Sequence, residues 1–289
     1  MDVSQRIEKT LESAVSKAGG TSCPPKLAEC LKYAVFPGGA RVRPRLSLAV
    51  AQACGDGTPK LADAAAASIE LLHCASLVHD DLPCFDDADV RRGKPSLHKA
   101  FGEPLAVLTG DALIVLAFET LGRHAVHAPD RLAPLIGVVS QAVGGPSGIC
   151  AGQAWECEPS VPLDEYHRAK TGSLFAAATV AGALAAGAEP SGWRRLGECL
   201  GEAFQVADDI CDHVADPDVL GKPRNQDIAN DRPNAVQRLG LEGAGQSLQA
   251  LLDEAIESIP DCEGAQQLRT VIAIQSKPFM PKGFTRHAA

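Results

Sequence analysis

The chain has 289 residues and a net charge of −9, and only 4% of its residues are aromatic. This length suits one large domain or two small ones, and the acidic balance argues against a general nucleic-acid binder. Ten cysteines form no CxxC pair and no zinc-type spacing. We therefore expect buried free thiols in a reducing cytoplasm.

The sequence does not predict a membrane protein. The first 17 residues are charged and amphipathic, unlike a signal peptide. No apolar run is expected to reach the roughly 20 residues that span a bilayer. We expect a cytoplasmic protein without a transmembrane segment.

Helical periodicity dominates the sequence, which is rich in alanine and poor in β-branched runs. A charged loop is expected over residues 86–96, a long loop over 216–233 and a frayed tail from about 277. The pattern predicts one all-α domain over 1–289, a single-domain helical bundle around a deep central cavity. The predicted helices span 3–17, 26–36, 44–53, 61–81, 104–121, 130–143, 148–157, 164–187, 193–214, 243–258 and 264–275.

A first cluster of acids follows the apolar helix predicted to begin near Leu61. Asp80 and Asp81 end that helix, and Asp86 lies six positions after Asp80. Pro83 breaks the helix, and the break is expected to fold Asp86 back toward Asp80. Crowded carboxylates repel one another unless cations compensate them.

A second cluster lies more than a hundred residues downstream, at Asp208, Asp209 and Asp212. Asp208 and Asp212 are neighbours on one helical face because they are four positions apart. Groups of carboxylate oxygens suit Mg²⁺, which is often shared with substrate phosphates. The two clusters together indicate a metal clamp on a pyrophosphate.

Basic residues lie near both clusters and elsewhere along the chain. Arginine grips phosphate oxygens in pairs, and lysine acts as a point charge. His73 lies two helical turns before Asp80, and Gln205 lies three positions before Asp208. The pattern predicts one metal-bound and one metal-free pyrophosphate site. The bases in question are Arg41, Arg43, Arg91, Arg92, Lys94, Lys170 and Lys222.

These motifs, in this order, resemble the trans-isoprenyl diphosphate synthase family from about residue 30 to 240. The chain is most similar to bacterial geranylgeranyl diphosphate synthases of carotenoid and bacteriochlorophyll pathways. The motifs that carry the resemblance are Gly38-Gly39-Ala40-Arg41-Val42-Arg43-Pro44, Asp80–Asp87 with Arg91–Pro95, Gly110–Leu113, Lys170-Thr171-Gly172 and Asp208–Asp212.

The resemblance implies a homodimeric prenyltransferase that joins isopentenyl diphosphate to allylic diphosphates with two or three Mg²⁺ ions. Asp80, Asp86 and Asp208 would bind the metal, supported by Asp81, Asp209 and Asp212. Arg91, Lys170, Thr171, Gln205 and Lys222 would hold the allylic substrate. Arg43, His73 and Arg92 would hold isopentenyl diphosphate.

Three positions depart from the family pattern. Ala40 stands where the family usually has a lysine that contacts isopentenyl diphosphate, and Arg41, Arg43 and Arg92 are candidates to compensate. Glu156 stands where an aspartate is usual, and Arg232 where a lysine is usual.

Small residues before the first cluster bear on product length. The resemblance implies that a growing chain descends below Asp80, where farnesyl-type enzymes carry an aromatic residue five positions earlier. Here Ala75 and Ser76 occupy that region, which predicts a twenty-carbon product. An alternative is that Ala75 only allows two helices to approach closely. Candidates for the floor are Leu72, Leu116 and Phe118.

Three other functions remain open. A farnesyl diphosphate synthase shares the chemistry and makes a shorter product. A non-catalytic subunit of a heteromeric synthase fits Ala40 but not the six retained acids. A terpene cyclase fits poorly, because its cavity would use aromatic side chains to stabilise cations.

Overall fold

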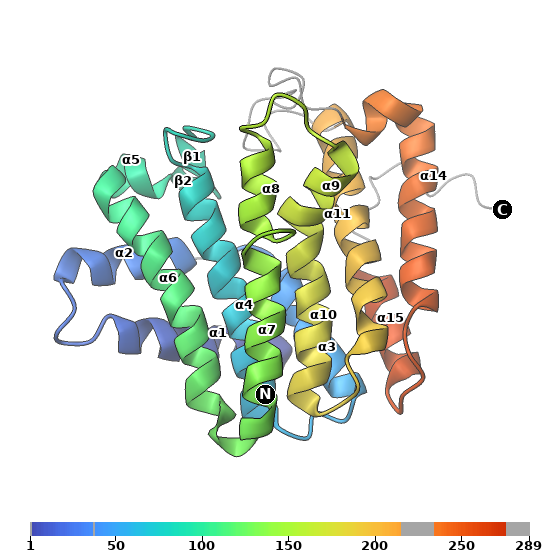
Figure 1. Ribbon diagram of the computed structural model, residues 1–289, viewed down its shortest axis with the longest axis horizontal. Coiled ribbons are helices and arrows are strands. Elements are labelled where there is room, and N and C mark those ends of the chain that lie inside the picture. The colour runs from blue at the N-terminus through green and yellow to red at the C-terminus, as the bar shows by residue number, and fades with distance from the viewer. Residues whose placement is uncertain (1, 37, 215–233, 276–289) are drawn as a thin grey trace. The chain divides into compact units, whose positions relative to one another are not determined.

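The computed structural model describes residues 2–36, 38–214 and 234–275. These residues group into two compact units, which are described separately below. Figure 1 labels the helices and strands of both. The first unit comprises residues 1–140 and 180–189, and the second comprises 141–179 and 190–289. The single-domain assignment and the deep central cavity stay predictions.

The first unit is built almost entirely of helices, with one short hairpin. The second half of α10 (Ser173–Ala186) also belongs to it. Its other elements are α1 (Val3–Ala18), α2 (Pro25–Val35), α3 (Val42–Ala53), α4 (Pro59–Asp80), β1 (Val90–Arg91), β2 (Lys94–Pro95), α5 (Leu97–Phe101), α6 (Glu103–His124), the 3₁₀ turns η1 (Ala125–His127) and η2 (Pro129–Arg131), and most of α7 (Leu132–Val143).

The second unit holds the first half of α10 and the end of α7. A π-helical turn, η3 (Arg168–Gly172), precedes α10 without a break. The other elements are α8 (Ile149–Trp155), α9 (Leu163–His167), the 3₁₀ turn η4 (Ser191–Trp193), α11 (Arg194–Val214), α14 (Ala235–Glu257) and α15 (Ala265–Gln275).

The all-α prediction is confirmed, with local corrections. The loop predicted over 86–96 contains the antiparallel pair β1–β2, closed by Arg92 and Gly93. Both have positive φ, 54° and 75°, as a two-residue hairpin turn of this kind requires. The predicted helix 243–258 begins earlier, at Ala235, where Asn234 and Gln237 form a capping box. Gly240 kinks it, with φ 69°.

Among the residues that the structure describes, three helical segments are long and apolar enough, by length and composition alone, to cross a membrane. The expectation of no such run is therefore wrong on this measure. In α4, 78% of the apolar stretch is buried inside the protein, whereas in α6 the buried share is 44%. The alanines of α4 are all buried. Because their side chains are small, α3 and α6 can pack closely against this helix. The third segment is Asp164–Ala186, 72% buried.

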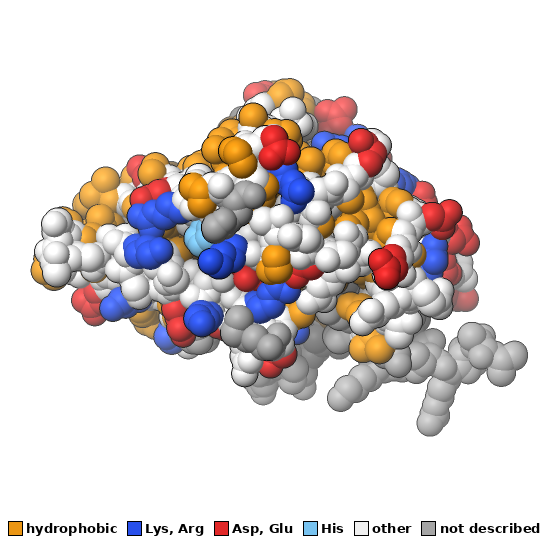
Figure 2. All heavy atoms as spheres, turned by 90° about the horizontal axis from the view of Figure 1, so that it is seen from below, with side chains coloured by type: hydrophobic (Ala, Val, Ile, Leu, Met, Phe, Trp, Pro, Cys, Tyr) orange, Lys and Arg blue, Asp and Glu red, His pale blue; other side chains and the backbone are white. Residues whose placement is uncertain are grey.

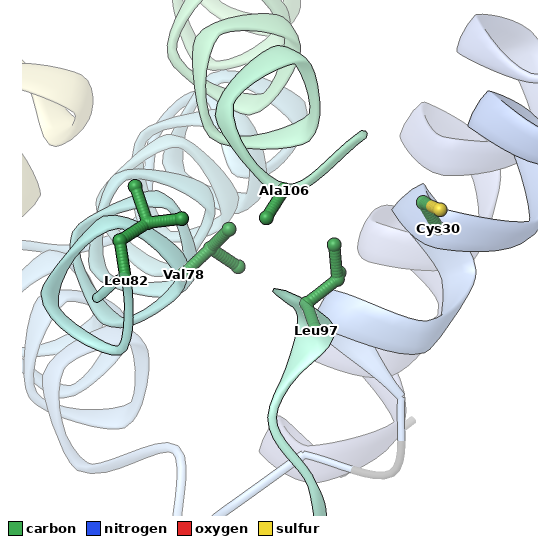
Figure 3. Packing of buried hydrophobic residues seen from close by; sticks show 5 residues of the cluster. All are labelled: Cys30, Val78, Leu82, Leu97 and Ala106. Carbon is green, nitrogen blue, oxygen red and sulfur yellow. The ribbon is translucent and has the colours of Figure 1, made fainter. Parts of the chain in front are cut away.

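A small apolar cluster lies beside the first acid motif (Figure 3). Val78 and Leu82 flank the acids in sequence, and they pack with Cys30 of α2, Leu97 of α5 and Ala106 of α6. All five are buried. This packing fixes the end of α4, so the acids that follow it start from a rigid support.

A buried ion-pair network holds the start of α3. Arg41 adopts a left-handed conformation, with φ 52°, as the residue that precedes α3. Its guanidinium donates to Glu70 at 2.7 Å, to Glu8 at 2.9 Å and to the Val35 carbonyl at 2.8 Å. Arg41 and Glu70 are both almost fully buried. Losing either charge would leave the other without its main compensation.

We predict that Glu70→Gln lowers the free energy of unfolding by about 3 kcal/mol, because it breaks a buried ion pair. Glu119→Gln is the matched control, since Glu119 pairs with Arg123 on an exposed face of α6. It should change stability by less than about 0.5 kcal/mol. Urea titration followed by circular dichroism measures both, and equal losses would contradict a special role for the buried pair.

Candidate functional site

The chain turns back on itself immediately after α4. Asp81 ends the helix, and the backbone N–H of Asp86 donates to the Asp80 carbonyl at 3.0 Å. The N–H of Ala88 likewise donates to the Asp81 carbonyl at 3.2 Å. The break at Pro83 therefore returns Asp86 to the neighbourhood of Asp80.

The acids of this turn differ in their surroundings. Asp81 is buried, and it accepts two hydrogen bonds from Arg91 of β1, from Nε at 2.9 Å and from an Nη at 2.5 Å. Burial alone would lower the pKa of Arg91, but the bonds to Asp81 raise it. Asp86 is exposed and Asp80 is half-buried. The hairpin thus neutralises Asp81 with a protein cation, while Asp86 reaches solvent.

A cationic group forms around His73, which lies in the middle of the α4 face that leads to Asp80. Burial, then the charges of Arg43 and Arg92, lower the pKa of His73 well below its ordinary value. Burial, opposed by Glu70 and reinforced by Arg92, lowers the pKa of Arg43 to about 10. His73 is therefore neutral near pH 7 and has one N–H to donate.

The same region contains a small pocket between α2, α4 and the hairpin. Six of its lining residues are Tyr33, Leu77, Asp81, Arg91, Arg92 and Lys94. The Tyr33 hydroxyl donates to the Pro95 carbonyl at 2.8 Å, and the Lys94 ammonium lies 5.3 Å from the Tyr33 ring centroid. A pocket with three cations and one acid favours an anionic ligand.

The suggestion that Arg41 compensates for the lysine missing at position 40 does not agree with its position in the structure. Its guanidinium is buried against Glu70 and Glu8, and a Cβ on Gly38 would lie 2.0 Å from its Cζ. A Cβ on Gly39 would instead lie 3.1 Å from the exposed Arg92 guanidinium. The glycine pair therefore lets two arginines approach the backbone, one directed inward and one at the surface.

The glycine of the Gly110-Asp111 motif in α6 makes room for a side chain of α4. A Cβ there would lie 2.1 Å from Nε2 of His79. The His79 ring therefore occupies the space above Gly110, where Nε2 also lies 3.3 Å from the Val107 carbonyl. This contact braces the last turn of α4 against α6 and gives His79 a structural role.

In the second unit, glycines hold α11 close to η3 and α10. A Cβ on Gly201 would lie 2.8 Å from Cα of Gly172, and one on Gly197 would lie 2.5 Å from the Phe175 carbonyl oxygen. Because Gly197 and Gly201 are four residues apart, they form one small-residue face of α11. The close approach places Thr171 within 3.2 Å of Gln205, to which its hydroxyl donates.

Asp209 accepts hydrogen bonds from two groups of the protein. Gln205 Nε2 donates to it at 3.0 Å, and the backbone N–H of Ala235 donates at 2.7 Å. Burial raises its pKa, opposed by these two bonds. Asp209 thus holds the first residue of α14, whereas Asp208 is half-buried and Asp212 is buried. Asp81 in the first cluster and Asp209 in the second are thus held by donors of the protein itself.

Lys170 lies in the π-helical turn and donates to Glu156 Oε1 at 2.5 Å. Tyr166 donates to the same oxygen at 2.6 Å, and Gln153 Nε2 donates to Oε2 at 3.2 Å. Tyr166 is not among the residues predicted from the sequence. Its position one helical turn before Lys170 was the available signal, because residues four apart share a face.

The remaining residues predicted for the site lie in different surroundings. Ala75 is buried within α4, and Ser76 donates to the His73 carbonyl at 2.9 Å. Lys222 and Arg232 lie outside the described residues, as do the loop 216–233 and the tail from 277. In the described part of the chain, no three His, Cys, Asp or Glu side chains form a metal-binding group.

The donors nevertheless fit magnesium. Asp80, Asp86 and Asp208 offer only carboxylate oxygens, which Mg²⁺ prefers. A site of this kind uses one or two carboxylates from the protein, and substrate phosphates and water supply the other ligands. Three protein ligands in one place are therefore not required.

Comparison with known proteins places these features in context. The family model described as polyprenyl synthetase matches residues 24–274. The geranylgeranyl diphosphate synthase of Cereibacter sphaeroides is 53% identical over 281 residues, covering 97% of this chain and 98% of the relative. That of Rhodobacter capsulatus is 53% identical over 280 residues, covering 97% of each.

Solved structures agree. The geranylgeranyl pyrophosphate synthetase of Pyrococcus horikoshii superposes with a TM-score of 0.80 at 27% identity, covering 95% of this chain and 98% of that one. A Helicobacter pylori geranyltransferase, solved with magnesium and isoprenyl diphosphate, gives 0.77 at 32% identity, covering 94% and 96%. The matched family model spans most of the sequence, and the chain belongs to the polyprenyl synthetase family.

Proposed function

We propose that this protein condenses isopentenyl diphosphate head to tail with allylic diphosphates, in the presence of magnesium, and forms geranylgeranyl diphosphate. The main support is 53% identity, over nearly the full length of both chains, to two enzymes named geranylgeranyl diphosphate synthase. The retained acid clusters and the cationic group around His73 support the same chemistry.

Asp80, Asp86 and Asp208 would hold two or three magnesium ions. When bound, magnesium would neutralise the negative charge of the leaving diphosphate. Lys170, Thr171, Gln205 and Arg91 would bind the allylic diphosphate, together with Lys222 and Arg232. Asp81, Asp209 and Asp212 would support this arrangement, because Asp81 orients Arg91 and Asp209 orients Gln205.

The chemistry starts with cleavage of the allylic carbon–oxygen bond, whose electron pair leaves with the diphosphate. The double bond of isopentenyl diphosphate then attacks the allylic cation and forms the new carbon–carbon bond. A proton leaves the neighbouring carbon, the double bond re-forms, and the departing diphosphate accepts the proton. Lys170 and Arg91 lower the barrier by stabilising the developing charge on the leaving group.

The second substrate needs a diphosphate site without metal. Arg43, His73 and Arg92 fit that task because two of them are arginines with fork-like donors and the third is a neutral imidazole. The burial that lowers the pKa values of Arg43 and His73 also strengthens their interaction with a bound anion. Arg41 takes no part, since it is committed to Glu70.

A farnesyl diphosphate synthase is the second candidate. The Helicobacter pylori structure named above carries the name geranyltransferase at 32% identity. Product length therefore has to be tested separately from chemistry. We favour twenty carbons because Ala75 leaves more room than an aromatic side chain at this position.

We also propose that the protein acts as a homodimer in the cytoplasm, in a pathway such as carotenoid biosynthesis. Support for a dimer comes from α6, which exposes Val107, Leu108 and Val115. Leu108 and Val115 are seven residues apart and so share one face of the helix, and contiguous exposed apolar groups mark interaction surfaces. Figure 2 shows apolar side chains among charged ones on one face of the surface. The cysteines are thiols, as expected, but only Cys30, Cys74 and Cys199 are buried, and the expectation of buried thiols is wrong for the exposed Cys84, Cys150 and Cys157.

If α6 forms the dimer contact, Leu108→Asp should convert the dimer into monomer, because it buries an uncompensated charge at the interface. Val126→Asp, at an exposed position beyond α6, is the control. Sedimentation equilibrium measures the mass of both variants. A Leu108→Asp protein that remains dimeric would exclude this face.

We predict that Asp80→Asn and Asp208→Asn each reduce kcat/KM at least about 100-fold, since each loses a metal-binding charge. Asp253→Asn is the control, because Asp253 lies exposed on α14, where it accepts a hydrogen bond from Gln249. Turnover is measured with isopentenyl diphosphate, geranyl diphosphate and magnesium. Near-normal activity in either variant would contradict the metal assignment.

We predict that Ala75→Phe shifts the main product from twenty to fifteen carbons, because the larger ring occupies space that the growing chain needs. Ala75→Ser keeps a small side chain and should retain the twenty-carbon product. Products are sized by chromatography after phosphatase treatment. An unchanged product distribution in Ala75→Phe would place the chain-length determinant elsewhere.

A further inference from the structure

The contacts of Glu156 exceed what a structural cap of α8 needs. The residue follows the last helical position of α8, and its carboxylate receives three side-chain donors. Lys170 and Tyr166 both donate to Oε1, and Gln153 donates to Oε2. The side chains of Glu156 and Lys170 are only 16% and 21% exposed, so water screens their interaction weakly.

The backbone allows little freedom in this arrangement. A Cβ on Gly152 would lie 2.4 Å from the backbone nitrogen of Lys170 and 2.5 Å from its Cα. The α8 helix therefore presses directly on the π-helical turn. Glu156 lies four residues after Gly152, one helical turn farther along, and so reaches the Lys170 side chain rather than its backbone.

Tyr166 contacts both members of the pair. It is buried, its hydroxyl holds Glu156, and its ring centroid lies 5.8 Å from the Lys170 ammonium. A cation near an aromatic face is stabilised by the ring. The tyrosine therefore restrains the lysine directly through its ring and indirectly through the carboxylate.

We propose that Glu156 is a positioning residue that holds Lys170 ready for the allylic diphosphate, and that Tyr166 fixes Glu156 for this task. The proposal rests on the function proposed above. A lysine ammonium has three N–H donors, so a bond to Glu156 is compatible with further bonds to phosphate oxygens.

Two effects of Glu156 oppose each other. Its negative charge weakens the attraction of Lys170 for a diphosphate, whereas its hydrogen bond removes the cost of immobilising a long, flexible side chain on binding. Immobilisation of such a side chain weakens binding by up to about tenfold. Because Tyr166 and Gln153 also donate to the carboxylate, its charge is already partly compensated, and positioning dominates.

Direct binding separates the two effects. The probe is geranyl thiolodiphosphate with magnesium, titrated calorimetrically, since its carbon–sulfur bond resists cleavage. Glu156→Leu should weaken binding about tenfold, and Tyr166→Phe about threefold, while binding of isopentenyl diphosphate stays within twofold. Glu156→Asp, which keeps the carboxylate, should recover at least part of the loss.

A double-mutant cycle shows whether Glu156 acts through Lys170. In a Lys170→Ala background, Glu156→Leu should weaken probe binding no further. Glu158→Leu, at an exposed acid two positions away, is the matched control and should leave binding unchanged. Thermal melting of every variant shows that it is folded.

Unchanged or tighter binding of the probe by both Glu156→Leu and Tyr166→Phe would overturn the proposal, and so would an undiminished effect in the Lys170→Ala background. Turnover by the unaltered protein tests the proposed function independently. If that protein makes no prenyl diphosphate, the function fails whatever the binding cycle shows.

Discussion

Crowded carboxylates must be compensated by positive charge or hydrogen bonds, and this constraint organises both acid clusters of the protein. In each cluster the compensation is divided. Asp81 is neutralised by Arg91, and Asp209 is held by Gln205 and the first N–H of α14. Asp86, by contrast, is exposed. Under the proposed function the buried acids shape the site, and Asp80, Asp86 and Asp208 bind the ions that the reaction needs.

The arginines are likewise divided between those that stabilise the structure and those that are available to a ligand. Arg41 stabilises the interior through Glu70, whereas Arg91 is oriented by Asp81 and stays partly exposed. Arg92 is exposed at a tight hairpin turn, in a strained backbone conformation that the two short strands maintain. Glycine is what makes these placements possible. Gly38 accommodates Arg41, Gly110 accommodates His79, and Gly152 lets α8 press on the turn that carries Lys170.

Much of this was predictable from the sequence. The helical class followed from alanine content and periodicity, and the return of Asp86 toward Asp80 followed from the break at Pro83. The hairpin was not foreseen, because a two-residue strand is too short to show an alternating pattern. The roles of Arg41 and Arg43 could not be separated either. The sequence places them two positions apart, and only the left-handed backbone at Arg41 directs its side chain to Glu70.

Tyr166 illustrates a second limit. Its contact with Glu156 joins α9 to the end of α8, and this contact depends on the close packing at Gly152. Helical spacing indicates that Tyr166 and Lys170 share a face, but it does not indicate what faces them. Contacts between elements of this kind lie beyond a reading of local pattern.

The most direct test of the central claim is crystallography with manganese in place of magnesium and with geranyl thiolodiphosphate bound. Anomalous scattering then locates the ions without ambiguity. The account predicts ions bonded to Asp80 or Asp86 and to Asp208, all contacting one diphosphate, while Asp81 and Asp209 keep their protein partners. A diphosphate bound without ions at either cluster would contradict it.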